Sequence, residues 1–130
     1  MNAINIDDLR TLARKRLPRT VFEFIDGGAQ DEITLRANRE DFSALRLVPR
    51  VLTDITTRTQ SIELFGQRYA SPLVLAPTGL AGLLARRGEL QAVRAAHRAN
   101  IPYCLSTMAT RSIEEISAEV DSPHWFQLYV

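Results

Sequence analysis

Uncharged hydrogen-bonding residues follow or end three apolar segments in the second half of the chain. The residues at these three positions are Ala76, Pro77, Thr78 and Gly79, then Ser106, Thr107 and Met108, then Gln127 and Tyr129. Their functional groups are hydroxyls, a carboxamide, a phenol and the backbone of a glycine turn, none of which exchanges protons near neutral pH. Such a set suits the binding of a planar heteroaromatic cofactor with several ring donors and acceptors, but it cannot by itself perform acid–base catalysis.

Each of these residues also has a purely structural explanation. A serine that follows a strand, such as Ser106, serves equally well as a helix cap or a turn former. Tyr129 could pack in the core with its hydroxyl at the rim. Gln127 is harder to explain in this way, because a buried amide without partners costs about 1–3 kcal/mol. Gln127 is therefore the residue that most strongly indicates a binding site.

The second half of the chain has the pattern of parallel βαβ units. Apolar strands are predicted over 71–79, 101–107 and 124–130, and helices over 88–100 and 111–120, the second with Ser112 and Glu115 as a capping box. Near-continuous apolar strands that alternate with helices are typical of parallel sheets covered on both faces. Both an open doubly wound sheet and a closed (β/α)8 barrel are built this way. The first turn reads APTGLAG and lacks the first glycine of GxGxxG, which favours the barrel.

The first half predicts three helices, an extended segment and a hairpin. Asn5 is expected to cap a helix that ends at Leu17-Pro18, a second helix runs from Pro18 to Gly27-Gly28, and Asp31 is expected to cap a third from Glu32 to Phe42. Residues 45–52 are expected to be extended, and residues 61–72 to form a hairpin that turns at Gly66.

Composition restricts the class of protein. The 130 residues are 45% hydrophobic and 24% charged, and the net charge is +1, so nothing favours nucleic acid as a partner. The single cysteine, Cys104, cannot form an internal disulfide or a zinc cluster, and we expect no metal. The N-terminus does not resemble a signal peptide and no apolar run approaches the ~20 residues of a membrane span, so we expect a cytoplasmic protein.

Length also bears on the architecture. A complete (β/α)8 barrel needs about 250 residues. We therefore expect residues 1–130 to form the N-terminal part of a single domain, with three of eight barrel strands preceded by helices and a hairpin, and truncated after the third strand.

Long stretches of the chain resemble one enzyme family. They are RLPRTVFEFIDGGAQDEITLRANREDF, SPLVLAPTGLAGLLARRGELQAVRAAHRANIPYCLST and SIEEI followed by WFQLYV. In this order and without gaps they resemble the FMN-dependent 2-hydroxy acid dehydrogenases and oxidases, which include flavin-type L-lactate dehydrogenase, mandelate dehydrogenase and glycolate oxidase. The DGGA and ARRGE stretches are most similar to the bacterial lactate and mandelate dehydrogenases.

The resemblance implies FMN as the cofactor and a role for each candidate residue. The backbone of residues 76–79 would lie against the flavin ring, where small residues allow close approach. Ser106 and Gln127 would hydrogen-bond the isoalloxazine. Tyr129 would face the substrate side of the flavin, with its hydroxyl near the substrate carboxylate or the developing carbonyl, and Met108 would lie beside the substrate.

One residue departs from the family pattern. Phe24, in VFEFIDGGA, stands where the family usually has a tyrosine whose hydroxyl helps to bind the substrate carboxylate. Phenylalanine keeps the ring but loses a hydrogen bond to a charged group, which is worth about 1.5–3 kcal/mol. We therefore expect small hydroxy acids such as lactate to bind less well.

The implied reaction is oxidation of an (S)-2-hydroxy acid to the 2-oxo acid, with electrons passed on to a quinone, a cytochrome or oxygen. The family's base histidine, carboxylate-binding arginines, flavin-side lysine and phosphate loops belong to later strands, so we expect this chain alone to be inactive. The intact enzyme is expected to be a homo-oligomer, cytoplasmic or peripheral to the inner membrane. The alternative is a non-catalytic truncated product or interaction remnant of the family. Another flavin barrel, such as an isopentenyl-diphosphate isomerase, fits less well because the match extends through the N-terminus.

Overall fold

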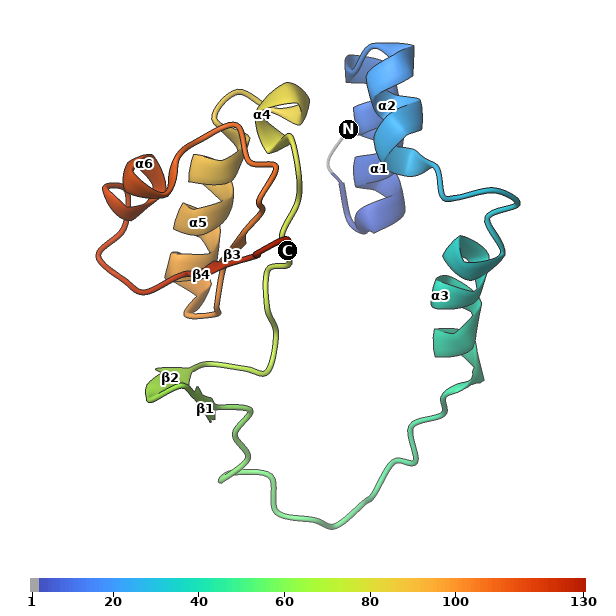
Figure 1. The fold of residues 1–130 in the computed structure, drawn as a ribbon. Helices are drawn as coiled ribbons and strands as arrows, with labels where there is room; N and C mark the ends of the chain where they lie inside the picture. The colour runs from blue at the N-terminus through green and yellow to red at the C-terminus, as the bar shows by residue number, and fades with distance from the viewer. Residues whose placement is uncertain (1–2) are drawn as a thin grey trace. The chain divides into compact units, whose positions relative to one another are not determined.

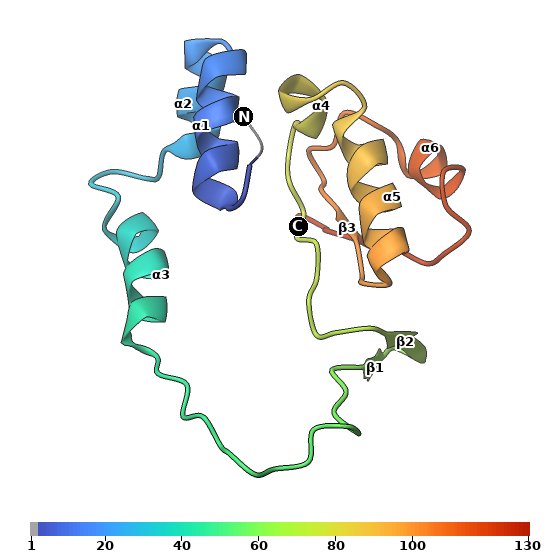
Figure 2. The ribbon, with the colours of Figure 1, turned by 180° about the vertical axis from the view of Figure 1, so that it is seen from behind.

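The computed structural model describes residues 3–130, and the chain divides into two compact units between Asp54 and Ile55 (Figures 1 and 2). The first unit contains α1 (Ile6–Arg16), α2 (Arg19–Asp26) and α3 (Ile33–Ala44). The second contains β1 (Ile62–Leu64), β2 (Gln67–Tyr69), α4 (Ala81–Leu84), α5 (Gly88–Ala99), β3 (Cys104–Leu105), α6 (Ile113–Ser117) and β4 (Trp125–Phe126). We describe the two units separately.

The start of α1 confirms the predicted cap. The Asn5 side chain accepts a hydrogen bond from the backbone N–H of Asp8 at 2.8 Å, and Asp7 and Asp8 lie in the first turn. Both carboxylates are favourable there because the helix N-terminus carries partial positive charge. The helix stops at Leu17, whose extended backbone leads into Pro18 and α2, as predicted.

The predicted cap of α3 is wrong. The residue at the N-cap position is Glu32, not Asp31, and it has a left-handed backbone (φ 57°) with no side-chain capping bond. The Glu32 carboxylate instead accepts a hydrogen bond from the backbone N–H of Gly28 at 3.0 Å. This hydrogen bond closes the loop between α2 and α3. The helix α3 begins one residue later than an Asp31 cap requires.

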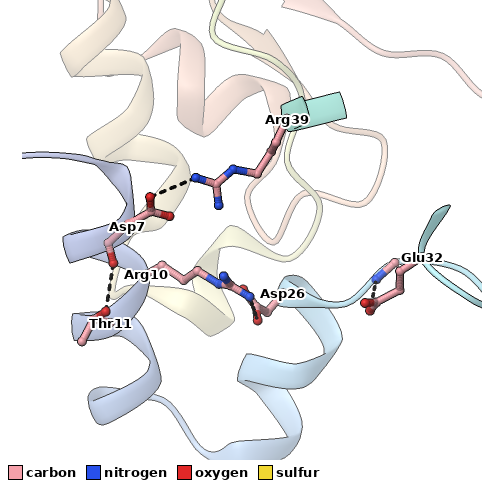
Figure 3. A network of polar contacts seen from close by, with 7 residues as sticks. Asp7, Arg10, Thr11, Asp26, Glu32 and Arg39 are labelled. Carbon is pink, nitrogen blue, oxygen red and sulfur yellow. Dashed lines mark hydrogen bonds and ion pairs between the residues drawn. The ribbon is translucent and has the colours of Figure 1, made fainter. Parts of the chain in front are cut away.

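Exposed ion pairs connect the three helices of the first unit (Figure 3). Arg10 of α1 donates to both carboxylate oxygens of Asp26 in α2, at 2.5 and 2.8 Å. Arg39 of α3 donates to Asp7 at 2.9 Å. The hydrogen bonds from these guanidinium groups lower the pKa values of Asp26 and Asp7 below the ordinary range. Because both pairs are open to solvent, they orient the helices more than they stabilise them.

The β1–β2 hairpin turns where predicted. The strands are antiparallel, with Leu64 opposite Gln67 and Ile62 opposite Tyr69. The two residues between the strands, Phe65 and Gly66, have positive φ values of 51° and 74°. Two positive φ angles in a two-residue loop define a type I′ turn, whose twist matches that of the flanking strands. Glycine at the second position adopts this backbone without steric cost.

The parallel sheet is shorter than predicted. Leu75 forms a single parallel bridge with Tyr103, and β3 pairs in parallel with β4, so that Cys104 lies opposite Trp125. The strand predicted over 71–79 is thus reduced to one bridge, held by Leu75 N–H to Pro102 O at 2.9 Å and Cys104 N–H to Leu75 O at 3.0 Å. Pro72 and Pro77 lie on either side of Leu75, and since proline lacks an N–H, neither residue can donate to the ladder.

The core of the second unit lies between α5, the parallel strands and α6. It consists of Leu90, Val93, Ala96, Tyr103, Leu105 and Ile116. The three α5 residues recur at helical spacing, and Tyr103 and Leu105 alternate along the strand, so each element turns one apolar face to the others. Ile116 is completely buried. The core side chains of β3 lie on the face of the sheet that the helices cover, and Cys104 lies on the opposite face.

The α6 helix confirms the predicted capping box. The Ser112 hydroxyl accepts from the Glu115 N–H at 3.2 Å, and the Glu115 carboxylate accepts from the Ser112 N–H at 3.0 Å. The short helix α4 was not predicted. It begins after Leu80, which has a left-handed backbone (φ 54°), and no local sequence signal marks that conformation.

Replacing Ser112 with alanine should lower the free energy of unfolding by about 1 kcal/mol, because the N–H of Glu115 loses its acceptor. Urea denaturation followed by the fluorescence of the single tryptophan, Trp125, measures this change. Ser117→Ala is the matched control, since Ser117 is exposed at the other end of α6. Equal midpoints for the two variants would show that the capping box contributes nothing.

Candidate cofactor-binding site

The candidate residues of the second unit lie at one edge of the parallel sheet. Leu75, β3 and β4 run in the same direction, so their carboxyl ends share that edge. The segments that leave it are the turns 76–80 and 106–110 and the chain from Gln127 onward. This is the edge at which α/β proteins bind their ligands.

Ser106 and Gln127 form the buried polar part of the site. Ser106 is only 4% exposed, and its hydroxyl donates to the side-chain oxygen of Gln127 at 3.2 Å. The same hydroxyl accepts from the Met108 N–H at 3.1 Å. The Gln127 backbone is also held, because its N–H donates to Leu105 O at 2.9 Å and its carbonyl accepts from the Thr107 hydroxyl. The oxygen of the half-buried carboxamide therefore has a hydrogen-bond partner, and the backbone that carries the side chain is held by two further hydrogen bonds.

The turn 76–80 lies directly against the turn 106–110. A Cβ atom at Gly79 would be 3.3 Å from the Met108 Cβ and 3.7 Å from the Ser106 hydroxyl oxygen. The N–H of Leu80 donates to the Met108 carbonyl at 2.9 Å. A side chain at Gly79 would crowd this junction, so glycine allows the two turns to approach each other closely. The uncharged donors and the close backbone fit the isoalloxazine ring of a flavin.

The three predicted substrate-side residues, Tyr129, Met108 and Phe24, are all exposed within their own units. Tyr129 is 62% exposed after β4, and the Met108 side chain is 53% exposed beside Gly79. Phe24 lies on α2 in the first unit and is 71% exposed. Exposure leaves all three accessible to a ligand but does not position them.

Glu89 is the site residue that the sequence prediction missed. It stands in the first turn of α5 and is completely buried. Its Oε1 accepts from the N–H and the hydroxyl of Thr110 at 2.8 and 2.9 Å, and from the N–H of Gly82 at 3.3 Å. A glutamate in a first turn is ordinarily an exposed partner of the helix dipole. The burial that distinguishes Glu89 depends on residues distant in sequence, so no local pattern reveals it.

The charge of Glu89 is maintained despite this burial. Burial raises the pKa of the carboxyl, but the hydrogen bonds from Thr110 and Gly82 outweigh it, and the pKa lies below its ordinary value of 4.5. A pKa lowered by folding means that the ionised group stabilises the fold above its unfolded-state pKa. That contribution is lost as the pH falls through the folded-state value.

The sequence profile of the FMN-dependent dehydrogenases matches residues 13–130. The chain belongs to the FMN-dependent dehydrogenase family. The resemblance found in the sequence motifs is thus confirmed, and so is FMN as the cofactor of the family.

Within this family, the chain is similar to lactate and mandelate dehydrogenases of bacteria. The chain is 48% identical over 123 residues to L-lactate dehydrogenase of Pseudomonas syringae pv. syringae, covering 95% of this chain and 32% of that protein. It is 43% identical over 129 residues to (S)-mandelate dehydrogenase of Pseudomonas putida, covering 99% and 33%. A crystal structure of a soluble mutant of the membrane-associated P. putida enzyme superimposes with a TM-score of 0.92 at 43% identity, covering 99% and 37%. The chain therefore spans about a third of the length of these relatives.

Within residues 3–130, no group of three or more histidine, cysteine, aspartate or glutamate side chains is arranged to hold a metal ion. Over the same residues, no helix is long and apolar enough to cross a membrane.

Proposed function

We propose that this chain supplies part of the FMN site of an enzyme that oxidises an (S)-2-hydroxy acid of the lactate, mandelate or glycolate type to the 2-oxo acid. One observation carries the proposal. In a member of the FMN-dependent dehydrogenase family, Gly79, Ser106 and Gln127 meet at the carboxyl edge of the parallel sheet, with Ser106 buried and bonded to Gln127.

The proposed cofactor contacts follow from this geometry. The backbone of residues 76–79 lies along the flavin ring, where Gly79 and Ala76 leave room for close approach. The Ser106 hydroxyl donates its hydrogen bond to the side-chain oxygen of Gln127, so this oxygen already has a partner. The carboxamide nitrogen of Gln127, which carries two protons, then donates to the acceptors of the ring. When bound, FMN supplies the acceptor for the two electrons removed from the substrate, and these residues hold and orient it.

Tyr129, Met108 and Phe24 are proposed to line the substrate side. The phenol of Tyr129 donates a hydrogen bond to the substrate carboxylate or to the carbonyl that develops from the hydroxyl. Met108, adjacent to Gly79, limits the size of the substrate side chain. Phe24 presents an apolar ring where a tyrosine would supply a donor to the substrate carboxylate, so small hydroxy acids such as lactate bind less well.

The larger assembly is also a proposal. We infer that Leu75, β3 and β4 mark the first three of eight barrel strands, and that residues 1–130 belong to a single domain. We propose a homo-oligomeric enzyme that is cytoplasmic or peripheral to the inner membrane, and the membrane-associated P. putida relative supports the peripheral location. The electron acceptor is a quinone, a cytochrome or oxygen. The competing proposal is a non-catalytic product or interaction remnant of the family, which would need no bound flavin.

Titration with FMN tests the proposed site and separates it from the competing proposal. In the protein as its gene encodes it, Gln127→Met should raise the Kd for FMN about tenfold, because two hydrogen bonds of about 0.5–1.5 kcal/mol each are lost at similar side-chain length. Quenching of flavin fluorescence measures the affinity. Gln60→Met, at an exposed loop position, is the control and should leave the Kd unchanged. Failure of the unsubstituted protein to bind FMN, or equal affinity in Gln127→Met, would contradict the proposal.

A further inference from the structure

The buried carboxylate of Glu89 joins the two turns that form the candidate flavin site. It reaches Thr110, at the end of the 106–110 turn, with two hydrogen bonds of 2.8 and 2.9 Å. It reaches Gly82, at the start of α4 just beyond the 76–80 turn, with a third of 3.3 Å. One oxygen of one side chain thus receives donors from both segments.

Other contacts also join the two segments. A Cβ atom at Gly82 would collide with the side chain of Thr110, so the missing side chain of Gly82 lets Thr110 approach. On the other side, Leu80 N–H donates to Met108 O at 2.9 Å, and Met108 N–H donates to the Ser106 hydroxyl at 3.1 Å. Glu89 is therefore bonded to Thr110, and Met108, two residues earlier in the same turn, is bonded to Ser106. Ser106 in turn holds the carboxamide of Gln127 at 3.2 Å.

The burial of a charge at this place requires an explanation. Removing a carboxylate from water is costly unless hydrogen bonds compensate for the lost hydration. A glutamine would have a similar size and would avoid the charge, but its amide oxygen accepts more weakly than a carboxylate, and its amide group brings two donors into a place already supplied with donors. Three donors converge on the ionised Oε1, whereas Oε2 is buried without a hydrogen-bond partner among the described residues.

We propose that Glu89 is a positioning residue of the flavin site: by holding Thr110 and Gly82 together, it sets the relative position of the turns 76–80 and 106–110, which lie against each other at the edge of the sheet that receives the isoalloxazine ring. Glu89 makes no contact with the cofactor itself in this proposal. The inference rests on the proposed FMN site.

Four variants test the inference in the protein as its gene encodes it, with FMN as the probe. Glu89→Gln weakens all three hydrogen bonds, and Thr110→Val removes only the hydroxyl donor at nearly constant volume. Thr110→Ser keeps that donor and serves as the rescue. Glu63→Gln, a neutralised carboxylate at an exposed hairpin position, is the control for the change of charge. The readouts are the Kd for FMN, the visible circular dichroism of bound FMN and the thermal midpoint.

We expect the Kd for FMN to rise at least about tenfold in Glu89→Gln and about threefold to tenfold in Thr110→Val, in line with the loss of charge-assisted hydrogen bonds. The circular dichroism of the bound flavin should change in both variants, while Thr110→Ser and Glu63→Gln should match the unsubstituted protein. If Glu89→Gln does not fold, the comparison of Thr110→Val with Thr110→Ser decides alone.

The outcomes separate the inference from the proposed function. If the unsubstituted protein does not bind FMN, the proposed function fails and the inference fails with it. If that protein binds FMN, and the variants lower the thermal midpoint but keep both the Kd and the flavin spectrum, the proposed function stands. Glu89 would then be a structural residue only, and the inference would be overturned.

Discussion

Replacing Ile116 with alanine is expected to lower the free energy of unfolding by roughly 2–5 kcal/mol. Ile116 is completely buried on α6 and packs into the core shared with α5 and the parallel strands. Truncation removes the apolar contacts of Ile116 and leaves a cavity between α6, α5 and the parallel strands. The backbone pairing of β3 with β4 limits how far these elements can collapse into it. A loss of this size is a large part of the stability of an ordinary domain. Urea denaturation followed by Trp125 fluorescence measures it.

Ile113→Ala supplies a matched control on the same helix. The Ile113 side chain is 45% exposed, so the same deletion removes less buried surface and should cost under about 1 kcal/mol. Both variants carry the same change in helix propensity, and their difference isolates the packing in the core. Similar losses for the two variants would show that α6 is not packed against α5 and the sheet as described.

Phe24→Tyr is expected to lower the KM for a small 2-hydroxy acid such as lactate about tenfold or more, if the protein has the proposed activity. The new hydroxyl can donate to the substrate carboxylate, and a hydrogen bond to a charged group is worth about 1.5–3 kcal/mol. Phe24 is 71% exposed on α2, so the added hydroxyl does not disturb a packed core. Steady-state kinetics with lactate and with mandelate would measure the change for a small and a large substrate.

A second exposed phenylalanine provides the control for this substitution. Phe42 on α3 is 76% exposed, and Phe42→Tyr adds the same hydroxyl at a position without a proposed substrate role. Its KM values should equal those of the unsubstituted protein. An unchanged KM for both acids in Phe24→Tyr would show that Phe24 does not contact the substrate. The proposed flavin contacts of Gln127 and Ser106 would not be affected by that result.

Features that depend on neighbouring residues were predictable from the sequence. The Asn5 cap and the capping box of Ser112 and Glu115 are confirmed, because each cap joins atoms three residues apart. The hairpin turn at Gly66 is confirmed for the same reason, since a two-residue loop allows few backbone conformations. The motifs of the second half likewise indicated the FMN-dependent dehydrogenase family, which the profile match over residues 13–130 confirms.

Local patterns failed where a competing interaction was stronger. Asp31 has the residue type of a cap, but the bond between the Glu32 carboxylate and Gly28 holds the chain in another conformation. The strand predicted over 71–79 has the right apolar residues, but it forms one bridge with Tyr103. The left-handed backbone at Leu80 that precedes α4 has no sequence signal, because leucine rarely adopts it outside a constrained tertiary setting.

The sequence by itself determined the order of the helices other than α4, the hairpin, the family, and the residue types at the carboxyl ends of the strands. Only the tertiary structure decided that Ser106 and Gln127 bond to each other, that Gly79 lies against Met108, and that Glu89 is a buried link between two turns. The physical reason is the range of the interactions involved. Caps and turns are set by groups a few residues apart, whereas the burial of a charge depends on groups about twenty residues away that meet only when α5 packs on the sheet.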